Sequence, residues 1–307
     1  MKHYCLLCLT FLLATAACDR EPCTLCTETL PRHLRLELSG LSLQTKGQPL
    51  HCLLYVFSRT GQLVDCHSSE AGRFDFYLTD ETYDFVVVAN KMDLPTREVT
   101  KATLFSSVTR LDENAADRLV MVGQLDGHTV DADEKITVEV QRVAAKVTYA
   151  LHLAFEGTLA SQPFAVEKVY MTNVVGENRL SLADSLPAAS SPWFNRMDWE
   201  SGNSGPEDLL SGPEFYIYPN ASADNHDKTQ WESRCTRFVV KASLAGRTTY
   251  YPVTLDKVRS NHHYHIDLTV ANWGVDHPED TLQTYGGASA IISVLAWEPG
   301  GAFEGTY

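Results

Sequence analysis

The sequence predicts an all-β protein built from two tandem β-sandwich domains, with a short helix in the first domain. Apolar and polar residues alternate with a period of two in many short segments, and clusters of Gly, Asn, Asp or Ser separate most of these segments. The chain has 307 residues, of which 44% are hydrophobic and 21% charged. That length and composition allow two hydrophobic cores and exclude a chain that is disordered as a whole.

The N-terminus has the form of a secretory signal peptide over residues 1–17. One positive charge precedes an apolar run over residues 4–13, and small residues follow up to Cys18. The run is too short for a permanent membrane helix, and no later segment is apolar enough to span a bilayer. A cysteine directly after the small residues predicts lipid attachment at Cys18, and ordinary cleavage that leaves a free thiol is the alternative. Residues 18–32 are then a lipid-proximal linker.

The first domain is expected to cover residues 33–143. Its first strand carries three leucines on one face and charged residues on the other. The next segment, Leu50 to Phe57, is apolar on both faces, which is typical of a central strand. Alternation also predicts the strands Arg73–Leu78, Thr82–Ala89 and Ile136–Val140.

One segment of the first domain is expected to be helical. Thr96 is the expected cap of this helix, because apolar residues recur at near-helical spacing after it, at Val99, Ala102, Phe105 and Val108. The boundary between the domains is expected near residues 141–143, where one strand ends and another begins almost at once.

The second domain is expected to cover residues 144–307. Alternation predicts the strands Lys146–Leu153, Glu167–Val174, Glu214–Tyr218, Arg237–Leu244, Thr249–Leu255, Tyr264–Val270 and Ala288–Trp297. Residues 181–211 are rich in Ser, Pro, Gly and Asp, and we expect a long surface excursion there.

Charge and cysteine usage narrow the possible functions. A net charge of -14 with interspersed acids and bases repels phosphate backbones, so nucleic acid is excluded as an expected partner. Acylation of Cys18 and loss of the signal would leave five cysteines, an odd number that makes no closed disulfide framework. Cys52 and Cys66 could face each other across a hairpin that turns near Arg59. The pair in residues 23–26 has zinc-like spacing without a second pair, which favours unpaired thiols.

Two motifs invite a reading as enzymatic or metal sites, and neither is complete. Residues Asn90–Asp93 have the form of a guanine-reading loop, but no glycine-rich phosphate loop precedes them, so a turn after a core strand is favoured. His263 and His265 would share a face of a strand, which permits a two-point metal site without a third ligand. We therefore expect no catalytic, metal or cofactor site, and a protein that is not an enzyme.

Several segments occur in an order and spacing that span nearly the whole chain. They are Leu53–Phe57, Phe85–Asn90, Val140–Val147, Phe215–Asn220, Tyr250–Val253, Val258–Tyr264 and an apolar strand that ends at Trp297. Together with the lipoprotein start, these segments resemble the FimA-type fimbrillins, the precursors of type V pilus subunits. The most telling is Val140–Val147, with an arginine and small residues where the two domains meet. The resemblance implies that the two tandem sandwiches are Greek-key domains of the transthyretin-like type.

The resemblance also implies how the protein assembles. In such pilins the first strand, here His33–Leu41, fills a groove until a trypsin-like protease cuts behind it. A C-terminal segment of the next subunit then fills the groove. Lys46 is the cleavage candidate, with Gly47 as the new N-terminus, whereas cleavage at Arg32 or Arg35 would leave part of the strand behind.

The implied donor lies at the C-terminus. A strand that is apolar on both faces suits burial between layers. From the sequence alone, this segment could equally be the closing strand of the second sandwich. The donor candidates are Ala290, Ile291, Ile292, Val294, Leu295, Ala296 and Trp297.

The function implied by the resemblance is structural. The chain would be a lipoprotein precursor at the outer membrane and then a subunit of a surface fimbrium that serves cell adhesion. Its partners would be other pilus subunits of the same or a different kind, the processing protease and, through the lipid, the outer membrane. Its place as major, minor, tip or anchor subunit stays open. The alternatives are an anchor or accessory subunit that keeps its lipid, and a surface lipoprotein that binds glycans through Trp193, Trp199 and Trp231.

Overall fold

A computed structural model describes most of the chain between residues 31 and 297. The described residues are 31–40, 51–115, 118–180, 193–199, 212, 214–220, 235–280 and 288–297, with only the backbone described for 193–199 and for Ala296. Regular structure in these residues is almost entirely β-strand, which confirms the all-β class. In this part of the chain, no helix has the length and apolar character needed to cross a membrane.

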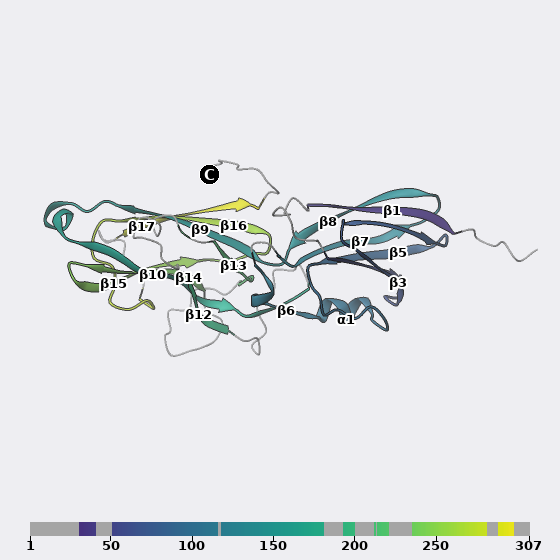
Figure 1. The fold of residues 1–307 in the computed structure, drawn as a ribbon, viewed down its shortest axis with the longest axis horizontal. Coiled ribbons are helices and arrows are strands. Elements are labelled where there is room, and N and C mark those ends of the chain that lie inside the picture. Colours follow the sequence, from purple (N-terminus) through teal and green to yellow (C-terminus); the bar gives the residue numbers. More distant parts are fainter. Residues whose placement is uncertain are drawn as a thin grey trace, which may run out of the picture.

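Seven strands from the first half of the chain, Arg32–Arg142, form one continuous sheet. The strands are β1 (Arg32–Ser39), β2 (Cys52–Ser58), β3 (Leu63–Ser69), β4 (Arg73–Leu78), β5 (Thr82–Ala89), β7 (Met121–Thr129) and β8 (Glu134–Arg142). They follow the order β3-β2-β5-β7-β8-β1-β4. Strands β7 and β8 pair over only three residues each, Met121–Gly123 with Val140–Arg142. The sheet folds over at this short pairing, so that β8, β1 and β4 form a second layer (Figure 1).

The two layers enclose a hydrophobic core. Alternation along β4 places Phe74, Phe76 and Leu78 inside and the residues between them outside. Strand β1 contributes Leu34 and Leu36, both fully buried. The inner faces of β2, β5 and β8 complete this core.

The second face of β2 and β5 is also buried, which confirms the expected central position of β2. Tyr55 and Val86 on this face belong to a second core that includes Leu104 of α1 (Lys101–Ser106). The expected cap at Thr96 is wrong, because the cap is Thr100, whose hydroxyl accepts the backbone N–H of Thr103 at 3.1 Å. Glu98 has φ of +53°, and a right-handed helix cannot run through that conformation.

The second half of the chain, Ala145–Ala296, forms two further four-stranded sheets. One has the order β12-β10-β14-β15 and the other β13-β9-β16-β17. Their bounds are β9 (Ala145–Leu153), β10 (Phe164–Val175), β12 (Trp193–Trp199), β13 (Phe215–Ile217), β14 (Thr236–Leu244), β15 (Arg247–Leu255), β16 (His262–Val270) and β17 (Ala288–Ala296). Aromatic contacts join the sheets, as between Tyr149 and Phe238 with ring centroids 4.8 Å apart.

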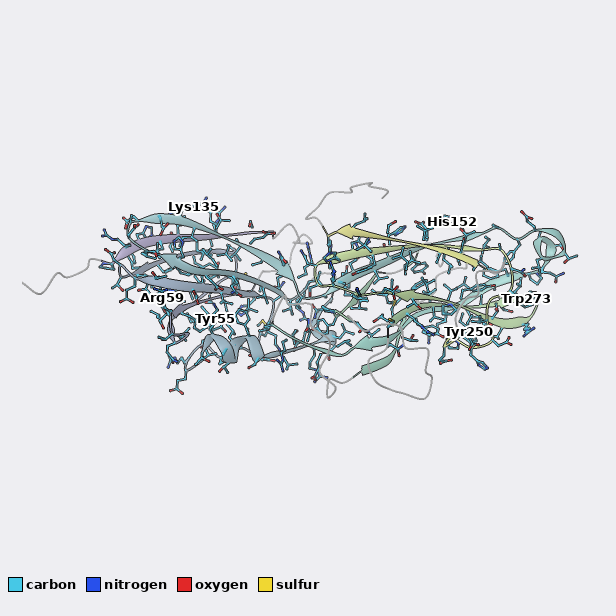
Figure 2. All side chains as sticks on the ribbon, turned by 180° about the vertical axis from the view of Figure 1, so that it is seen from behind. Tyr55, Arg59, Lys135, His152, Tyr250 and Trp273 are labelled. Atoms are coloured by element: carbon cyan, nitrogen blue, oxygen red, sulfur yellow. The ribbon has the colours of Figure 1, made fainter. Side chains whose placement is uncertain are left out.

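The two halves meet along an extensive junction. Strand β8 ends at Arg142 and β9 begins at Ala145, with Val143 and Ala144 fully buried between them. A small sheet pairs β6 (Val108–Arg110) of the first half with β11 (Glu177–Arg179) of the second. One continuous hydrophobic core extends from α1 across the junction into the second half. Figure 2 shows Tyr55 on one side of the junction and Trp273 near the far end of the other half.

The expected strands all occur, but several strands have no counterpart in the sequence prediction. These are β3, β6, β7, β11 and β12, and two 3-10 turns (Leu111–Glu113 and Gly157–Ser161) were also not predicted. The expectation of a surface excursion over residues 181–211 is wrong for Trp193–Trp199, because this segment pairs with β10 as β12. The domain limits 33–143 and 144–307, the Greek-key order and the transthyretin-like topology stay predictions.

Candidate functional site

Strand β1 sits between two partners that are otherwise unconnected at that place in the sheet. It runs parallel to β8, with Leu36 opposite Ile136, and antiparallel to β4, with Leu36 opposite Phe74. Its leucines point into the first core, whereas Arg35 on the opposite face is exposed. A single strand therefore closes both the hydrogen-bond ladder and the apolar slot between β8 and β4.

Ion pairs lie at the two ends of β1, at the surface. At one end, Arg32 donates from Nε and Nη2 to the Asp80 carboxylate at 2.6 and 2.8 Å. Toward the other end, Lys135 Nζ lies 2.6 Å from Glu37 Oε2. Such exposed pairs contribute little, so the buried leucines and the two ladders hold the strand. The strand is followed by Gly40, which has φ of +81° and whose Cβ, if present, would lie 2.5 Å from the Val140 carbonyl oxygen.

The predicted processing sites lie mostly outside the described residues. This holds for the signal peptide, Cys18, most of the linker, Lys46 and Gly47. The alternative cleavage positions Arg32 and Arg35 lie within β1. Cleavage after either of them would leave Leu36 in the sheet, so the structure offers no clean release of the strand there.

The predicted donor segment is an edge strand in this structure. Strand β17 pairs antiparallel with β16 along its whole length, and its other side ends the sheet order. Ile292 packs against the core of the second half, whereas Ala290 on the same face is exposed. Ile291 and Val294 are 67% and 53% exposed, and Leu295 is half-buried. Among the described residues, one edge of this apolar strand has no partner strand, and sheet proteins ordinarily shield such an edge.

The strand ends in a cluster around Trp297. The guanidinium carbon of Arg142 lies 4.2 Å from the centroid of the Trp297 ring, and Tyr216 stacks on the same ring at 5.8 Å. Arg142 is 2% exposed, and its burial lowers the pKa of the guanidinium to about 10. The sequence prediction included Trp297 and missed Arg142, although the short segment Val140–Val147 already marked that region.

Both histidines of the pair on β16 lie within hydrogen-bond distance of one threonine. Thr148 Oγ1 lies 2.7 Å from His263 Nε2 and 2.8 Å from His265 Nδ1. Burial first, and Lys146 second, lower the pKa of His263, which favours its neutral form. Within the described residues, no group of three or more His, Cys, Asp or Glu side chains could hold a metal ion.

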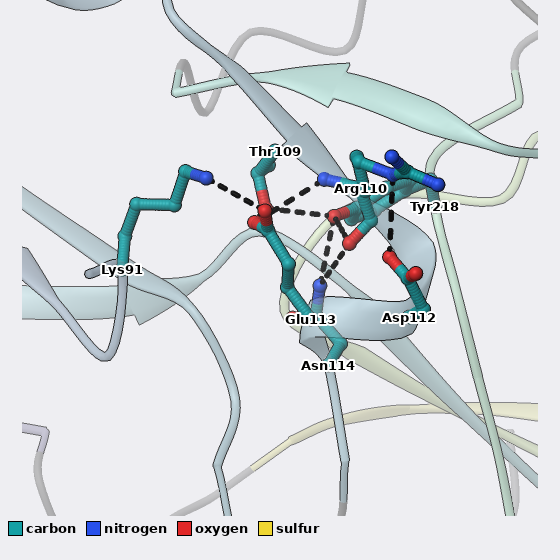
Figure 3. A network of polar contacts seen from close by, with 7 residues as sticks. All are labelled: Lys91, Thr109, Arg110, Asp112, Glu113, Asn114 and Tyr218. Carbon is teal, nitrogen blue, oxygen red and sulfur yellow. Dashed lines mark hydrogen bonds and ion pairs between the residues drawn. The ribbon is translucent and has the colours of Figure 1, made fainter. Parts of the chain in front are cut away.

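A polar network occupies the junction between the halves (Figure 3). Tyr218 of the second half donates its hydroxyl to the Arg110 carbonyl oxygen at 2.7 Å and accepts from Asn114 at 2.8 Å. Glu113 accepts from Lys91 Nζ at 2.6 Å and from Thr109 Oγ1 at 2.8 Å. Burial alone would raise the pKa of the Glu113 carboxyl, but these hydrogen bonds outweigh burial and leave it below its ordinary value.

The segment Asn90–Asp93, whose Lys91 belongs to this network, forms a turn in the structure. Asn90 has φ of +61° and donates from Nδ2 to the Leu119 carbonyl oxygen at 2.9 Å, so it terminates β5 in a turn. The adjacent pocket, of about 350 Å³, carries three basic and three acidic side chains: Lys91, Arg110, Arg118, Asp93, Asp112 and Glu113. Its formal charges cancel, so the pocket offers a triphosphate no excess of positive charge. The observed turn agrees with the reading favoured from sequence.

The register of β2 and β3 excludes the possible disulfide between Cys52 and Cys66. Cys66 lies opposite Tyr55, whereas Cys52 lies opposite Ser69. Cys52 belongs to the core between the two layers, while Cys66 packs against the core on the other face of β2. Both thiols are free, because residues with this register and these opposite faces cannot form a disulfide.

The tryptophans named for glycan binding are only partly described. Trp193 and Trp199 form the two ends of β12, and Trp231 lies outside the described residues. Glycan binding through these tryptophans therefore stays a prediction.

Comparison with known proteins finds similarity to fimbrial proteins. No protein-family model matches the chain. Over 150 residues the chain is 28% identical to the major fimbrium subunit FimC of Porphyromonas gingivalis. The matched region covers 45% of this chain and 31% of that protein. The chain thus spans less than a third of the length of this curated relative.

Two solved structures share the fold over most of the chain. The fimbrilin FimA of Porphyromonas gingivalis has a TM-score of 0.65 at 15% identity, over 87% of this chain and 98% of that one. The second structure is the tip fimbrial protein Mfa3 of the same organism, truncated at its C-terminus. It has a TM-score of 0.58 at 15% identity, over 87% of this chain and 100% of that one. The resemblance to fimbrillin-type proteins that the sequence motifs indicate is confirmed.

Proposed function

We propose that this chain is a structural subunit of a cell-surface fimbrium that serves adhesion, exported as a lipoprotein precursor and assembled by strand exchange. The position of β1 in the sheet is the main observation behind this proposal. This one strand pairs with both β8 and β4, and its Leu34 and Leu36 fill the core. Its removal would leave two unpaired strand edges and an apolar slot. An incoming strand satisfies both. The likeness to fimbrial subunits supports the same role.

The donor would be β17 of a neighbouring subunit. Ala290, Ile292 and Val294 share one face, and their spacing matches that of the leucines at positions 34, 36 and 38. The outward face of the β1 position carries Arg35, which is exposed, so only one face of a donor needs to be apolar there. Release of β17 from its own subunit breaks pairing with one neighbour only, since it is an edge strand.

Export and anchoring complete the proposal. Cys18 would carry the lipid in the outer membrane, and cleavage between Lys46 and Gly47 would remove the lipid together with β1. The two domains, 33–143 and 144–307, would then form one unit of the polymer, with other pilus subunits as partners. The role is structural, so no catalytic group is required.

The first test sequences the N-terminus of the mature protein from cells and looks for SDS-resistant ladders. A start at Gly47 together with ladders supports strand exchange, and Lys46→Ala should abolish both. A blocked terminus at Cys18 without ladders would refute the stalk role and favour a lipid-retaining anchor. The lysine at position 46, where the resemblance leads us to expect arginine, makes the anchor the second candidate. Glycan binding by a monomer would instead favour the surface lipoprotein.

The second test probes the donor face. Val294→Asp places a charge on the proposed inward face, at a side chain that is 53% exposed in the subunit, so the monomer should fold normally. Ladders should be lost, because an unpaired carboxylate would be buried in the slot. Ile291→Asp is the matched control on the opposite face, where the native side chain is 67% exposed, and should keep ladders. Ladders from both variants would refute β17 as the donor.

A further inference from the structure

The end of β17 is held by a residue from the junction between the halves. Arg142 Nη1 donates to the Trp297 carbonyl oxygen at 2.9 Å, while the guanidinium carbon lies 4.2 Å from the ring centroid of the same residue. One side chain thus contacts both the backbone and the side chain of Trp297. Because these contacts are polar and directional, they select one position of the strand end.

Arg142 itself is fixed in place. It is the last residue of β8, and its Nη1 also donates to Asn261 Oδ1 at 2.9 Å. Asn261 precedes β16 in a turn with φ of +57°, and its backbone N–H donates to the Ala144 carbonyl oxygen at 3.0 Å. The guanidinium therefore stays with the junction, whichever position the C-terminal strand takes.

The guanidinium is incompletely satisfied. Its Nε and Nη2 atoms are buried and have no hydrogen-bond partner, and the ion pairs among the described residues do not include Arg142. Nε and Nη2 form the edge that binds a carboxylate in a two-point ion pair. An arginine retained for stability alone would be expected to have such a partner, because an unpaired buried charge is costly.

The rest of β17 depends on few side-chain contacts. Its ladder has one neighbour, and Ile291 and Val294 are largely exposed. Ala288 and Ile292 pack against the core only partly buried. At the end of the strand, Trp297 contacts both Tyr216 and Arg142, and Arg142 contacts its backbone carbonyl as well as its ring.

We propose that Arg142 is the retention residue of the C-terminal strand. Through Trp297 it holds β17 on its own subunit, and this hold can be broken when the strand is donated to a neighbouring subunit. Retention is a property of the unassembled subunit. Its role in assembly rests on the proposed function, because a strand that is never donated needs no release. The Arg142 guanidinium that holds the strand end is desolvated and lacks a counter-charge. The strand is therefore retained in the free subunit and can still be released during assembly.

The test measures hydrogen exchange in the full, unassembled chain. Arg142→Met keeps much of the side-chain volume and removes both contacts. We expect the amides of Ala288–Ala296 that are bonded to β16 to exchange at least tenfold faster in this variant (an order-of-magnitude expectation), with those of Thr236–Leu244 in β14 unchanged. Arg247→Met is the matched control, because Arg247 lies 5.5 Å over the Trp273 ring, far from the junction (Figure 2). It should leave β17 unchanged.

Three results would overturn the proposal. These are unchanged exchange in β17, slower exchange in β17, and faster exchange of equal size in β14 and β17, which would mean a general loss of stability. If Arg142→Met does not fold, Trp297→Leu and Tyr216→Leu decide the question together. Trp297→Leu removes the ring that Arg142 and Tyr216 both contact and should accelerate exchange in β17, whereas Tyr216→Leu removes only the stacking and should accelerate it less. Equal acceleration by the two variants would also overturn the proposal. Wild-type protein that forms no ladders would refute the proposed function and leave this measurement of retention valid.

Discussion

Replacing Leu36 by alanine should reveal how much of the stability of the first sandwich depends on β1. The side chain is fully buried, opposite Phe74 on one side and Ile136 on the other. Truncation of a leucine in such a site removes buried apolar surface and leaves a cavity, which destabilises a protein by about 3–5 kcal/mol. We expect the free energy of unfolding of Leu36→Ala to fall by that amount.

The assay is urea unfolding of the full chain, followed by far-UV circular dichroism. Leu153→Ala is the matched control, since it deletes the same atoms from a leucine that is 46% exposed at the end of β9. The control should change the free energy of unfolding by less than about 0.5 kcal/mol. The slope of the free energy against urea should stay the same in both variants, because each unfolds the same surface.

A small effect would refute the reasoning. If Leu36→Ala destabilised the protein no more than Leu153→Ala, β1 would not fill the core in solution. The apolar slot between β8 and β4 would then not depend on this strand, and the proposal that an incoming strand replaces β1 would lose its physical basis.

Three further predictions concern the junction and the thiols. The hydrogen-bonded Glu113 carboxyl has a pKa below its ordinary value of 4.5, so it stabilises the fold above that pH and loses this contribution as the pH falls through the folded pKa. Thermal unfolding against pH should show less acid destabilisation for Glu113→Gln than for wild type, and parallel profiles would contradict the network. Tyr218→Phe leaves buried polar partners without the hydroxyl and should destabilise the protein by about 1–3 kcal/mol in thermal unfolding, whereas Tyr77→Phe, at a residue 64% exposed, should have no effect. Burial raises the pKa of the Cys52 thiol to about 12, so iodoacetamide at pH 8 should modify it only after unfolding. A peptide that links Cys52 to Cys66 in mass spectra would contradict the observed register.

Much of the fold could be predicted from local patterns. Alternation identified β4 as Arg73–Leu78 and β5 as Thr82–Ala89, with the bounds that the structure has. The missed strands carry weaker patterns. Strand β7 contains two glycines within nine residues, and β3 carries Asp, His and Ser residues that also favour turns. The helix was expected in the right segment, but its start was misplaced, because the backbone conformation of Glu98 is not visible in spacing.

The candidate site could be predicted only in part. The apolar character of Ile291 and Val294 marked the C-terminal strand, and the resemblance to fimbrillins marked the first strand. Nothing in the sequence indicated that Tyr218 would reach the Arg110 carbonyl oxygen, 108 residues earlier in the chain. Contacts of this kind depend on how the two halves pack, and no local pattern encodes that packing.

By itself, the sequence determined the class of this protein, because the period of two in its apolar residues is a local property of each strand. It also determined that β2 would be central, since both faces of that segment are apolar. Only the tertiary structure decided that β1 runs between β8 and β4, that Cys52 and Cys66 lie on opposite faces, and that Arg142 holds a tryptophan 155 residues away. Strand order and register arise from long-range pairing, and a shift of one residue would turn every side chain to the other face.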